Sequence, residues 1–186
     1  MAKNLLILES SPRKKGNSTV LAEKAAQAAR QAGAEVSVFH LQGMKIAPCN
    51  ACDGCKRKKV FCTTQDDMQQ IYPVLEKTDA LLLASPVYWF TYTAQLKACI
   101  DRWYGLWNNR PYFLRGKPVG IILTYGDVDL YTSGGINAIH TFETTFRFLG
   151  APVAGWVYGS VNDIGDVQNT PDLLQAAAEL GSRLAQ

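Results

Sequence analysis

At 186 residues the chain is long enough to bury a core of its own, so we expect a single domain. Apolar residues make up 47% of the chain and charged residues 19%, the mix of an ordinary globular protein. The net charge of +3 is mild, and the basic residues form only one short run at 56–59, which argues against a nucleic-acid binder.

The sequence contains no stretch that approaches the length of a membrane span. Its N-terminal apolar run covers only residues 5–8, which is too short for a signal peptide. We therefore expect a cytoplasmic protein with no membrane partner. In that reducing compartment, cysteines favour metal or redox chemistry over structural disulfides.

Short apolar runs alternate along the chain with segments of helical character. Five runs are predicted to be strands: residues 4–10, 35–41, 79–85, 117–125 and 153–160. Five segments carry helical periodicity or capping signals: residues 17–34, 66–77, 93–107, 136–150 and 170–185. This alternation predicts an α/β fold with a doubly wound parallel sheet and helices on both faces.

The strand count and right-handed crossovers favour a flavodoxin-like sheet order of 2-1-3-4-5. No repeat, low-complexity tract or linker divides the chain, so residues 1–186 are predicted to form one domain, with a cysteine-rich loop at 48–63. In such a sheet a ligand binds at the carboxyl ends of strands 1 and 3, where the strand order reverses.

The loop after the first strand, "SSPRKKGNST" at 10–19, combines hydroxyl groups, a glycine and basic residues just before a helix. Free backbone N–H groups and the helix dipole favour an anion there, to which Arg13 adds charge. The loop matches neither the P-loop nor the dinucleotide glycine pattern, so a single terminal phosphate suits it better. The alternative is a solvated polar turn that caps the helix.

Two further loops follow strands that end at the same edge of the predicted sheet. Tyr88, Trp89, Phe90 and Tyr92 cluster after the third strand, where they can wall a flat ring or pack against a neighbouring loop or subunit. After the fourth strand, the "TYGDVD" backbone at 124–129 can bond the polar rim of a ring. A phosphate cradle, an aromatic wall and a polar edge together predict FMN.

The motifs "SSPRKKGNST", "DALLLASPVYWF" and "LKACIDRW" resemble those of the flavodoxin-fold NAD(P)H-dependent FMN reductases, and the cysteine loop followed by "DDM" resembles their iron–sulfur flavoprotein branch. The resemblance implies non-covalent FMN, NAD(P)H as co-substrate and a homodimer or homotetramer. Chemistry would take place on the flavin N5, without a protein acid or base. Relatives often carry Gly where this chain has Ser10, and the extra side chain is expected to narrow the approach to the phosphate.

Carried over by motif position, the resemblance implies three sets of FMN contacts. The phosphate contacts fall on Ser11, Arg13, Asn17, Ser18 and Thr19. The ring contacts fall on Pro86, Val87, Tyr88 and Trp89. The third loop contributes Thr124, Tyr125, Gly126 and Asp127.

Four of the five cysteines, Cys49, Cys52, Cys55 and Cys62, lie within the cysteine-rich loop. Their spacing, C-x2-C-x2-C-x6-C, lets one loop wrap around a [4Fe–4S] cluster and matches the motif of the iron–sulfur flavoproteins. Zinc, a disulfide switch and a loop that only packs against its neighbours remain alternatives. Cys99 is predicted to be a core residue.

The predicted function is transfer of electrons from NAD(P)H through FMN to a flavin, a quinone or a redox protein, with a cluster as a further carrier. His40 and His140 lie near no motif and receive no catalytic role. A non-catalytic electron carrier is the first alternative, although such carriers are usually acidic. A redox-sensing regulatory protein is the second. The aromatic stripe of Trp103, Tyr104 and Trp107 is assigned to the core or to a subunit interface.

Overall fold

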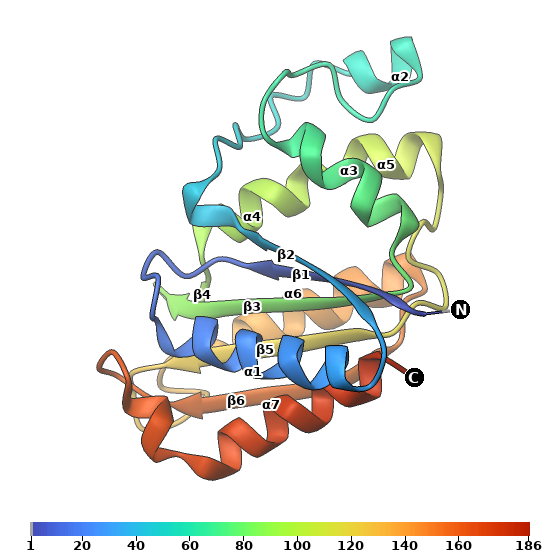
Figure 1. Ribbon diagram of the computed structural model, residues 1–186. Coiled ribbons are helices and arrows are strands. Elements are labelled where there is room, and N and C mark those ends of the chain that lie inside the picture. The colour runs from blue at the N-terminus through green and yellow to red at the C-terminus, as the bar shows by residue number, and fades with distance from the viewer. Residues whose placement is uncertain (1) are drawn as a thin grey trace.

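The computed structural model describes residues 2–186, and five long parallel strands run through its centre (Figure 1). They are β1 (Asn4–Glu9), β2 (Glu35–His40), β3 (Ala80–Tyr88), β5 (Val119–Tyr125) and β6 (Val153–Ser160), in the order β2-β1-β3-β5-β6. Counted among the long strands alone, this is the predicted order 2-1-3-4-5. A sixth strand, β4 (Thr91–Tyr92), pairs antiparallel with the end of β3 and was not predicted.

The central strands are apolar because helices cover both of their faces. Every residue of β5 is buried, as are all residues of β1 after Asn4. The edge strands β2 and β6 are only partly buried. Fully buried apolar runs in the middle and partly buried strands at the edges are what a doubly covered parallel sheet requires.

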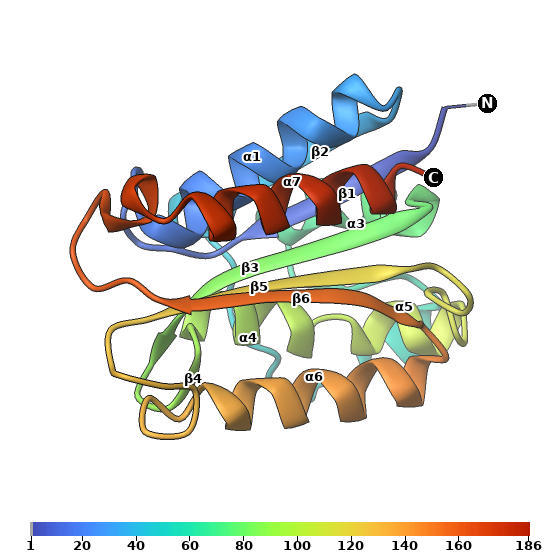
Figure 2. The ribbon, with the colours of Figure 1, turned by 90° about the horizontal axis from the view of Figure 1, so that it is seen from below.

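Figure 2 shows that helices cover both faces of the sheet. On the first face lie α1 (Asn17–Gln31) and α7 (Pro171–Leu184), which pack so closely that a Cβ on Gly181 would sit 2.1 Å from the Ala25 oxygen. The opposite face carries α3 (Met68–Lys77), α4 (Ala94–Asp101), α5 (Tyr104–Asn109) and α6 (Gly135–Leu149). Leu5 and Ile7 of β1 face α1, whereas Leu6 and Leu8 face the second layer.

The predicted helix at 93–107 is divided into α4 and α5 at Arg102 and Trp103. The backbone of Phe61 crosses α5 so closely that a Cβ on Gly105 would lie 1.4 Å from its oxygen. Of the aromatic stripe on this segment, Trp103 is buried, while Trp107 packs against Phe148 with ring centroids 4.8 Å apart and planes tilted by 43°.

Short elements within the loops complete the chain. They are the 3-10 turns η1 (Leu41–Gly43) and η2 (Asp166–Asn169) and, within the cysteine-rich loop, the helix α2 (Gly54–Lys58). The predicted core position of Cys99 is confirmed, since it is fully buried and burial raises the pKa of its thiol to about 12. Among residues 2–186, no helix is long and apolar enough to cross a membrane.

Candidate functional site

The carboxyl ends of β1, β3 and β5 open onto one shared hollow of about 150 Å³, which we call the edge hollow, at the edge where the arrowheads of Figure 1 end. Three sequence-predicted loops meet there, and ten of the predicted residues line it: Ser11, Arg13, Asn17, Ser18, Pro86, Val87, Tyr88, Thr124, Tyr125 and Gly126.

The loop between β1 and α1 is closed by its own hydrogen bonds. The Arg13 N–H donates to Ser11 Oγ at 3.1 Å, and the Gly16 N–H donates to the Arg13 carbonyl at 2.9 Å. A Cβ on Gly16 would lie 2.4 Å from Ser11 Oγ and 3.1 Å from the Arg13 carbonyl oxygen, so a larger residue would require the Ser11 side chain to move. Gly16 also lines the hollow and was not among the predicted contacts.

The first turn of α1 faces the hollow with donors that the helix itself leaves unpaired. Ser18 is 1% exposed, and within the described part of the chain its Oγ has no hydrogen-bond partner. A buried hydroxyl without a partner costs free energy, so Ser18 is suited to an acceptor supplied by a ligand. Together with the dipole of α1 and the exposed Arg13, it forms a site for an anion.

The side chain of Asn17 binds a fourth loop at the hollow and is therefore not free to contact a ligand. Its Nδ2 donates to the carbonyls of Val161 and Asp163 at 3.2 and 2.9 Å, and its Oδ1 accepts from the Gly165 N–H at 3.2 Å. This loop joins β6 to η2, and two of its residues, Val161 and Asn162, line the hollow. Sequence reasoning missed them, although the predicted fifth strand ends at the same edge of the sheet.

Thr19 is predicted as a phosphate contact but does not line the hollow. It is 1% exposed, and its hydroxyl donates to Glu9 Oε1 at 2.9 Å. The side chain of Ser10 also points away from the hollow, because its Oγ donates to the Ala84 carbonyl of β3 at 3.1 Å. The Ser10 side chain therefore does not narrow the hollow as the sequence suggested.

The hollow continues into a second one beside the end of β3. Val87, Tyr125 and Gly126 line both, and the second also takes in the predicted residues Trp89 and Asp127. Tyr125 lies between them, only 8% exposed, and burial raises the pKa of its phenol. The aromatic wall is thinner than expected, because Tyr92 turns into the core and stacks on Phe142.

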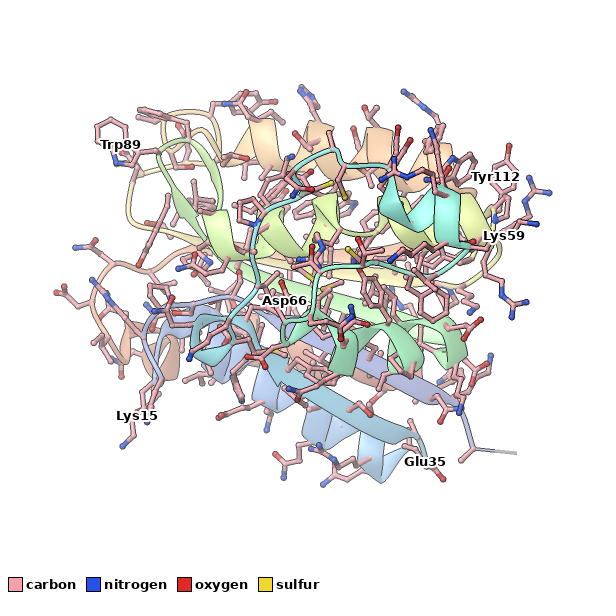
Figure 3. The ribbon with its side chains drawn as sticks, turned by 90° about the horizontal axis from the view of Figure 1, so that it is seen from above. Lys15, Glu35, Lys59, Asp66, Trp89 and Tyr112 are labelled. Atoms are coloured by element: carbon pink, nitrogen blue, oxygen red, sulfur yellow. The ribbon has the colours of Figure 1, made fainter. Side chains whose placement is uncertain are left out.

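Trp89 and Phe90 form the two-residue turn between β3 and β4, with positive φ angles of 45° and 67°. Positive φ at both central residues is the geometry of a type I′ hairpin turn, where Asn and Gly are preferred and bulky residues are strained. Trp89 is 92% exposed, and Figure 3 shows it projecting outward at the margin of the molecule. The chain thus holds an exposed aromatic residue in an unfavourable conformation beside the hollow.

The four loop cysteines line a separate, smaller cavity, which shares no lining residue with the edge hollow. Cys49 and Cys52 are exposed, Cys62 is half-buried, and Cys55 is buried. No disulfide joins any of them in residues 2–186. Figure 3 looks down on this region, with Asp66 near the centre of the view and Lys59 toward its margin.

Asp66 and Arg102 join the two ends of the cysteine-rich loop to α4. Both guanidinium nitrogens of Arg102 donate to Asp66, at 2.7 and 3.1 Å. Asp66 also accepts from the Ala47 N–H at 3.0 Å, and Arg102 donates to the Ala47 carbonyl at 2.8 Å. Burial acts to raise the pKa of Asp66, but these hydrogen bonds outweigh it and hold the pKa below its usual value.

The cysteine cavity has the donor chemistry of an iron–sulfur or metal site but not its geometry. Among residues 2–186, no three His, Cys, Asp or Glu side chains are arranged to hold a metal ion. Burial acts to raise the pKa of the Cys62 thiol. Hydrogen bonding from Thr64 and the nearby charge of Arg102 lower this pKa by more than burial raises it, so it lies below its usual value. In this arrangement the four thiols line one cavity without converging on a common metal position.

The edge hollow does fit a phosphorylated planar ligand. An unpartnered Ser18 hydroxyl, a helix N-terminus and Arg13 lie at one end, and Pro86, Tyr88 and Tyr125 lie at the other. The fold and this hollow define a flavodoxin-like α/β protein with a hollow at the topological switch point of the sheet, where proteins of this fold bind ligands.

Comparisons with known proteins identify the family. Residues 4–166 match the profile of the NADPH-dependent FMN reductase family. The chain is 33% identical over 178 residues to an iron-sulfur flavoprotein of Archaeoglobus fulgidus, covering 95% of this chain and 76% of the relative. It is 31% identical over 185 residues to the putative NAD(P)H-dependent FMN-containing oxidoreductase YwqN of Bacillus subtilis, covering 96% and 97%.

A solved structure agrees with these sequence matches. The Trp repressor binding protein from Bacillus subtilis superposes with a TM-score of 0.72 at 29% identity, covering 96% of this chain and 99% of the other. The chain therefore belongs to the NADPH-dependent FMN reductase family, and it is an enzyme of the oxidoreductase class. FMN and NAD(P)H are the cofactor and reductant of that family.

Proposed function

We propose that this enzyme binds FMN in the edge hollow and passes electrons from NAD(P)H to a flavin, a quinone or a redox protein. The observation that carries the proposal is the buried, unpartnered Ser18 Oγ at the N-terminus of α1, where a phosphate ester would supply the missing acceptor. When bound, FMN supplies the hydride chemistry.

Within this proposal the predicted phosphate residues have two kinds of role. Ser18, Arg13 and the free N–H groups of the first turn of α1 hold the phosphate. Asn17 and Thr19 shape the cradle, since their side chains already bond the loop at 161–167 and Glu9.

The remaining predicted contacts would surround the ring. Pro86, Val87 and Tyr88 form one wall and exclude water from it, while the backbone at Thr124, Tyr125 and Gly126 faces its polar rim. Trp89 and Asp127, in the adjoining hollow, border the side from which a nicotinamide would approach.

A spectrum of the protein purified under anaerobic conditions, followed by steady-state assays, tests this function. We expect two visible flavin bands, release of FMN on denaturation and oxidation of NAD(P)H with a quinone or free flavin as acceptor. FMN binding without turnover would instead indicate an electron carrier. A colourless, folded protein that ignores added FMN would contradict the proposal and favour a regulatory role.

We further propose that Cys49, Cys52, Cys55 and Cys62 are the ligands of a [4Fe–4S] cluster, which would require their thiols to lie closer together than in the described arrangement. Support comes from the four thiols lining one cavity and from the names of the iron-sulfur flavoprotein relatives. Cys52→Ala should abolish the broad absorption shoulder of a cluster and its iron content while FMN remains bound. Cys99→Ala, which removes a thiol outside the loop, should keep both. Equal iron content in the two variants would contradict the assignment.

A homodimer or homotetramer is also proposed, because large apolar side chains remain exposed near the hollow. Trp89, Val128 and Tyr131 are 92%, 81% and 73% exposed. Clusters of exposed apolar side chains are typical of interaction surfaces. Sedimentation equilibrium should give a multiple of the 20.5 kDa chain mass, and a monomer at all concentrations would contradict it.

A further inference from the structure

Glu9 is a buried carboxylate to which the proposed function gives no role. It is the last residue of β1 and is 2% exposed, at the end of a strand that is otherwise apolar after Asn4. Its position in the alternation of β1 matches that of Leu5 and Ile7, so its side chain points toward α1. Burying a carboxylate is costly unless strong hydrogen bonds compensate for it.

Three groups donate to this carboxylate. Oε1 accepts from the Ser11 backbone N–H at 2.7 Å and from the Thr19 hydroxyl at 2.9 Å. Oε2 lies 3.1 Å from Nδ1 of His40, its cross-strand neighbour in the register of β1 and β2. An ionised carboxylate only accepts hydrogen bonds, so the His40 Nδ1 is the donor.

The two donors to Oε1 lie at the two ends of the loop between β1 and α1, which we call the phosphate loop. Ser11 begins the loop after β1, and Thr19 lies in the first turn of α1. One carboxylate oxygen therefore fixes the start of the loop relative to the helix N-terminus. Charge-assisted bonds of this kind are about twice as strong as neutral ones.

Glu9 does not itself line the edge hollow. With His40 it lines two other hollows behind the loop, so it acts on the edge hollow only through Ser11 and Thr19. Its negative charge also opposes a phosphate bound on the far side of the loop. Glu9 therefore has two opposite effects on phosphate binding: it fixes the shape of the loop, which favours binding, and its negative charge disfavours it.

We propose that Glu9, held by His40, is the positioning residue that shapes the loop for a phosphate ester and so sets the preference of the hollow for FMN over riboflavin. This inference rests on the proposed function, because it assumes that FMN binds there. Under the proposed function the loops after β3 and β5 hold the ring, whereas the side-chain hydrogen bonds of Glu9 in residues 2–186 are to Ser11, Thr19 and His40. Its influence is therefore confined to the phosphate end.

The inference is tested by titrating the flavin-free protein with FMN and with riboflavin. Quenching of flavin fluorescence reports the affinity for each. Glu9→Ala removes both bonds to Oε1, so FMN affinity should fall by at least about tenfold while riboflavin affinity changes by less than about twofold. Glu9→Gln keeps an acceptor and removes the charge, so it should bind FMN as tightly as the unmodified protein or more tightly.

Two further variants keep the test decisive if Glu9→Ala folds poorly. Thr19→Val removes one of the two bonds with little change of shape and should give an intermediate, FMN-selective loss. Glu23→Ala removes a carboxylate that lines a hollow with Glu9 and His40 but forms none of these loop bonds, and should leave both affinities unchanged.

Equal losses for FMN and riboflavin, or a Glu9→Gln variant as weak as Glu9→Ala, would overturn the inference. So would unchanged FMN affinity in both Glu9→Ala and Thr19→Val. Failure of the unmodified protein to bind FMN would instead overturn the proposed function, so the two failures are distinguishable.

Discussion

Ser18 carries a hydroxyl that is buried without a hydrogen-bond partner among residues 2–186. Ser18→Ala should therefore have effects of opposite sign on stability and on binding. Removal of the unpaired hydroxyl should raise the free energy of unfolding of the FMN-free protein by up to about 1 kcal/mol, whereas FMN affinity should fall by about five- to tenfold because a ligand bond is lost.

Urea denaturation and FMN titration measure the two effects of Ser18→Ala separately. Ser37→Ala, on the exposed part of β2, serves as the matched control and should change neither quantity by more than a few tenths of a kcal/mol. A loss of stability together with unchanged FMN affinity would show that the Ser18 hydroxyl has a partner inside the protein.

Gly16 limits the phosphate loop by its size and not by its backbone angles, since its φ is −64°. In Gly16→Ala the new methyl group would lie 2.4 Å from Ser11 Oγ, so the Ser11 hydroxyl must turn away and give up its bonds to the Arg13 backbone that close the loop. We expect a large loss of FMN affinity and a loss of about 1–3 kcal/mol in stability, as for other overpacked sites. Gly43→Ala, where nothing lies within 4 Å of the added Cβ, should preserve FMN binding, and equal effects in both variants would contradict this account.

At the scale of elements, the hairpin of β3 and β4 stores strain in its aromatic turn. Replacing Trp89 and Phe90 by Asn and Gly would supply the residues that a type I′ turn favours. The free energy of unfolding should rise by about 1–3 kcal/mol, because two strained bulky residues are removed. Turnover with NAD(P)H should fall, because the exposed ring of Trp89 is lost from beside the hollow.

Thermal unfolding and steady-state kinetics check the turn variant. Phe148→Ser, which removes an aromatic residue at the far end of α6 together with its contact to Trp107, is the turnover control for the loss of an aromatic ring away from the hollow and should leave turnover unchanged. An unchanged or lower melting temperature in the Asn–Gly variant would indicate that the aromatic rings stabilise the turn by contacts that outweigh the strain.

At the scale of the whole molecule, the Asp66–Arg102 ion pair joins the cysteine-rich loop to the helical layer and makes stability depend on pH. The pKa of Asp66 is lower in the folded protein than in the unfolded chain, so its contribution is complete above about pH 4 and is lost as the pH falls through the folded value. Asp66→Asn leaves Arg102 buried without its charge partner, which should cost about 3–5 kcal/mol at neutral pH.

The difference in unfolding free energy between the unmodified protein and Asp66→Asn should shrink as the pH falls below about 4. Urea denaturation over a pH series measures it. Asp101→Asn breaks the exposed Lys97–Asp101 pair and should cost less than about 1 kcal/mol at any pH. A difference for Asp66→Asn that does not vary with pH would mean that Asp66 acts through neutral hydrogen bonds alone.

The sequence by itself determined the sheet and the place of the site. Apolar runs such as that at 79–85 identify buried parallel strands, and parallel strands must end at a common edge, so the loops after them converge. It did not predict β4, because the turn at Trp89 and Phe90 lacks the Asn or Gly that normally marks a hairpin.

Only the tertiary structure decided which polar groups at that edge are free. Asn17 is occupied by the loop at 161–167, and Glu9 is paired with His40 across two strands, while Ser18 has no partner within residues 2–186. The physical reason is that each buried polar group must find a partner, and those partners lie far away in the sequence. The roles of the residues in one short loop are therefore set by the packing of the whole chain around it.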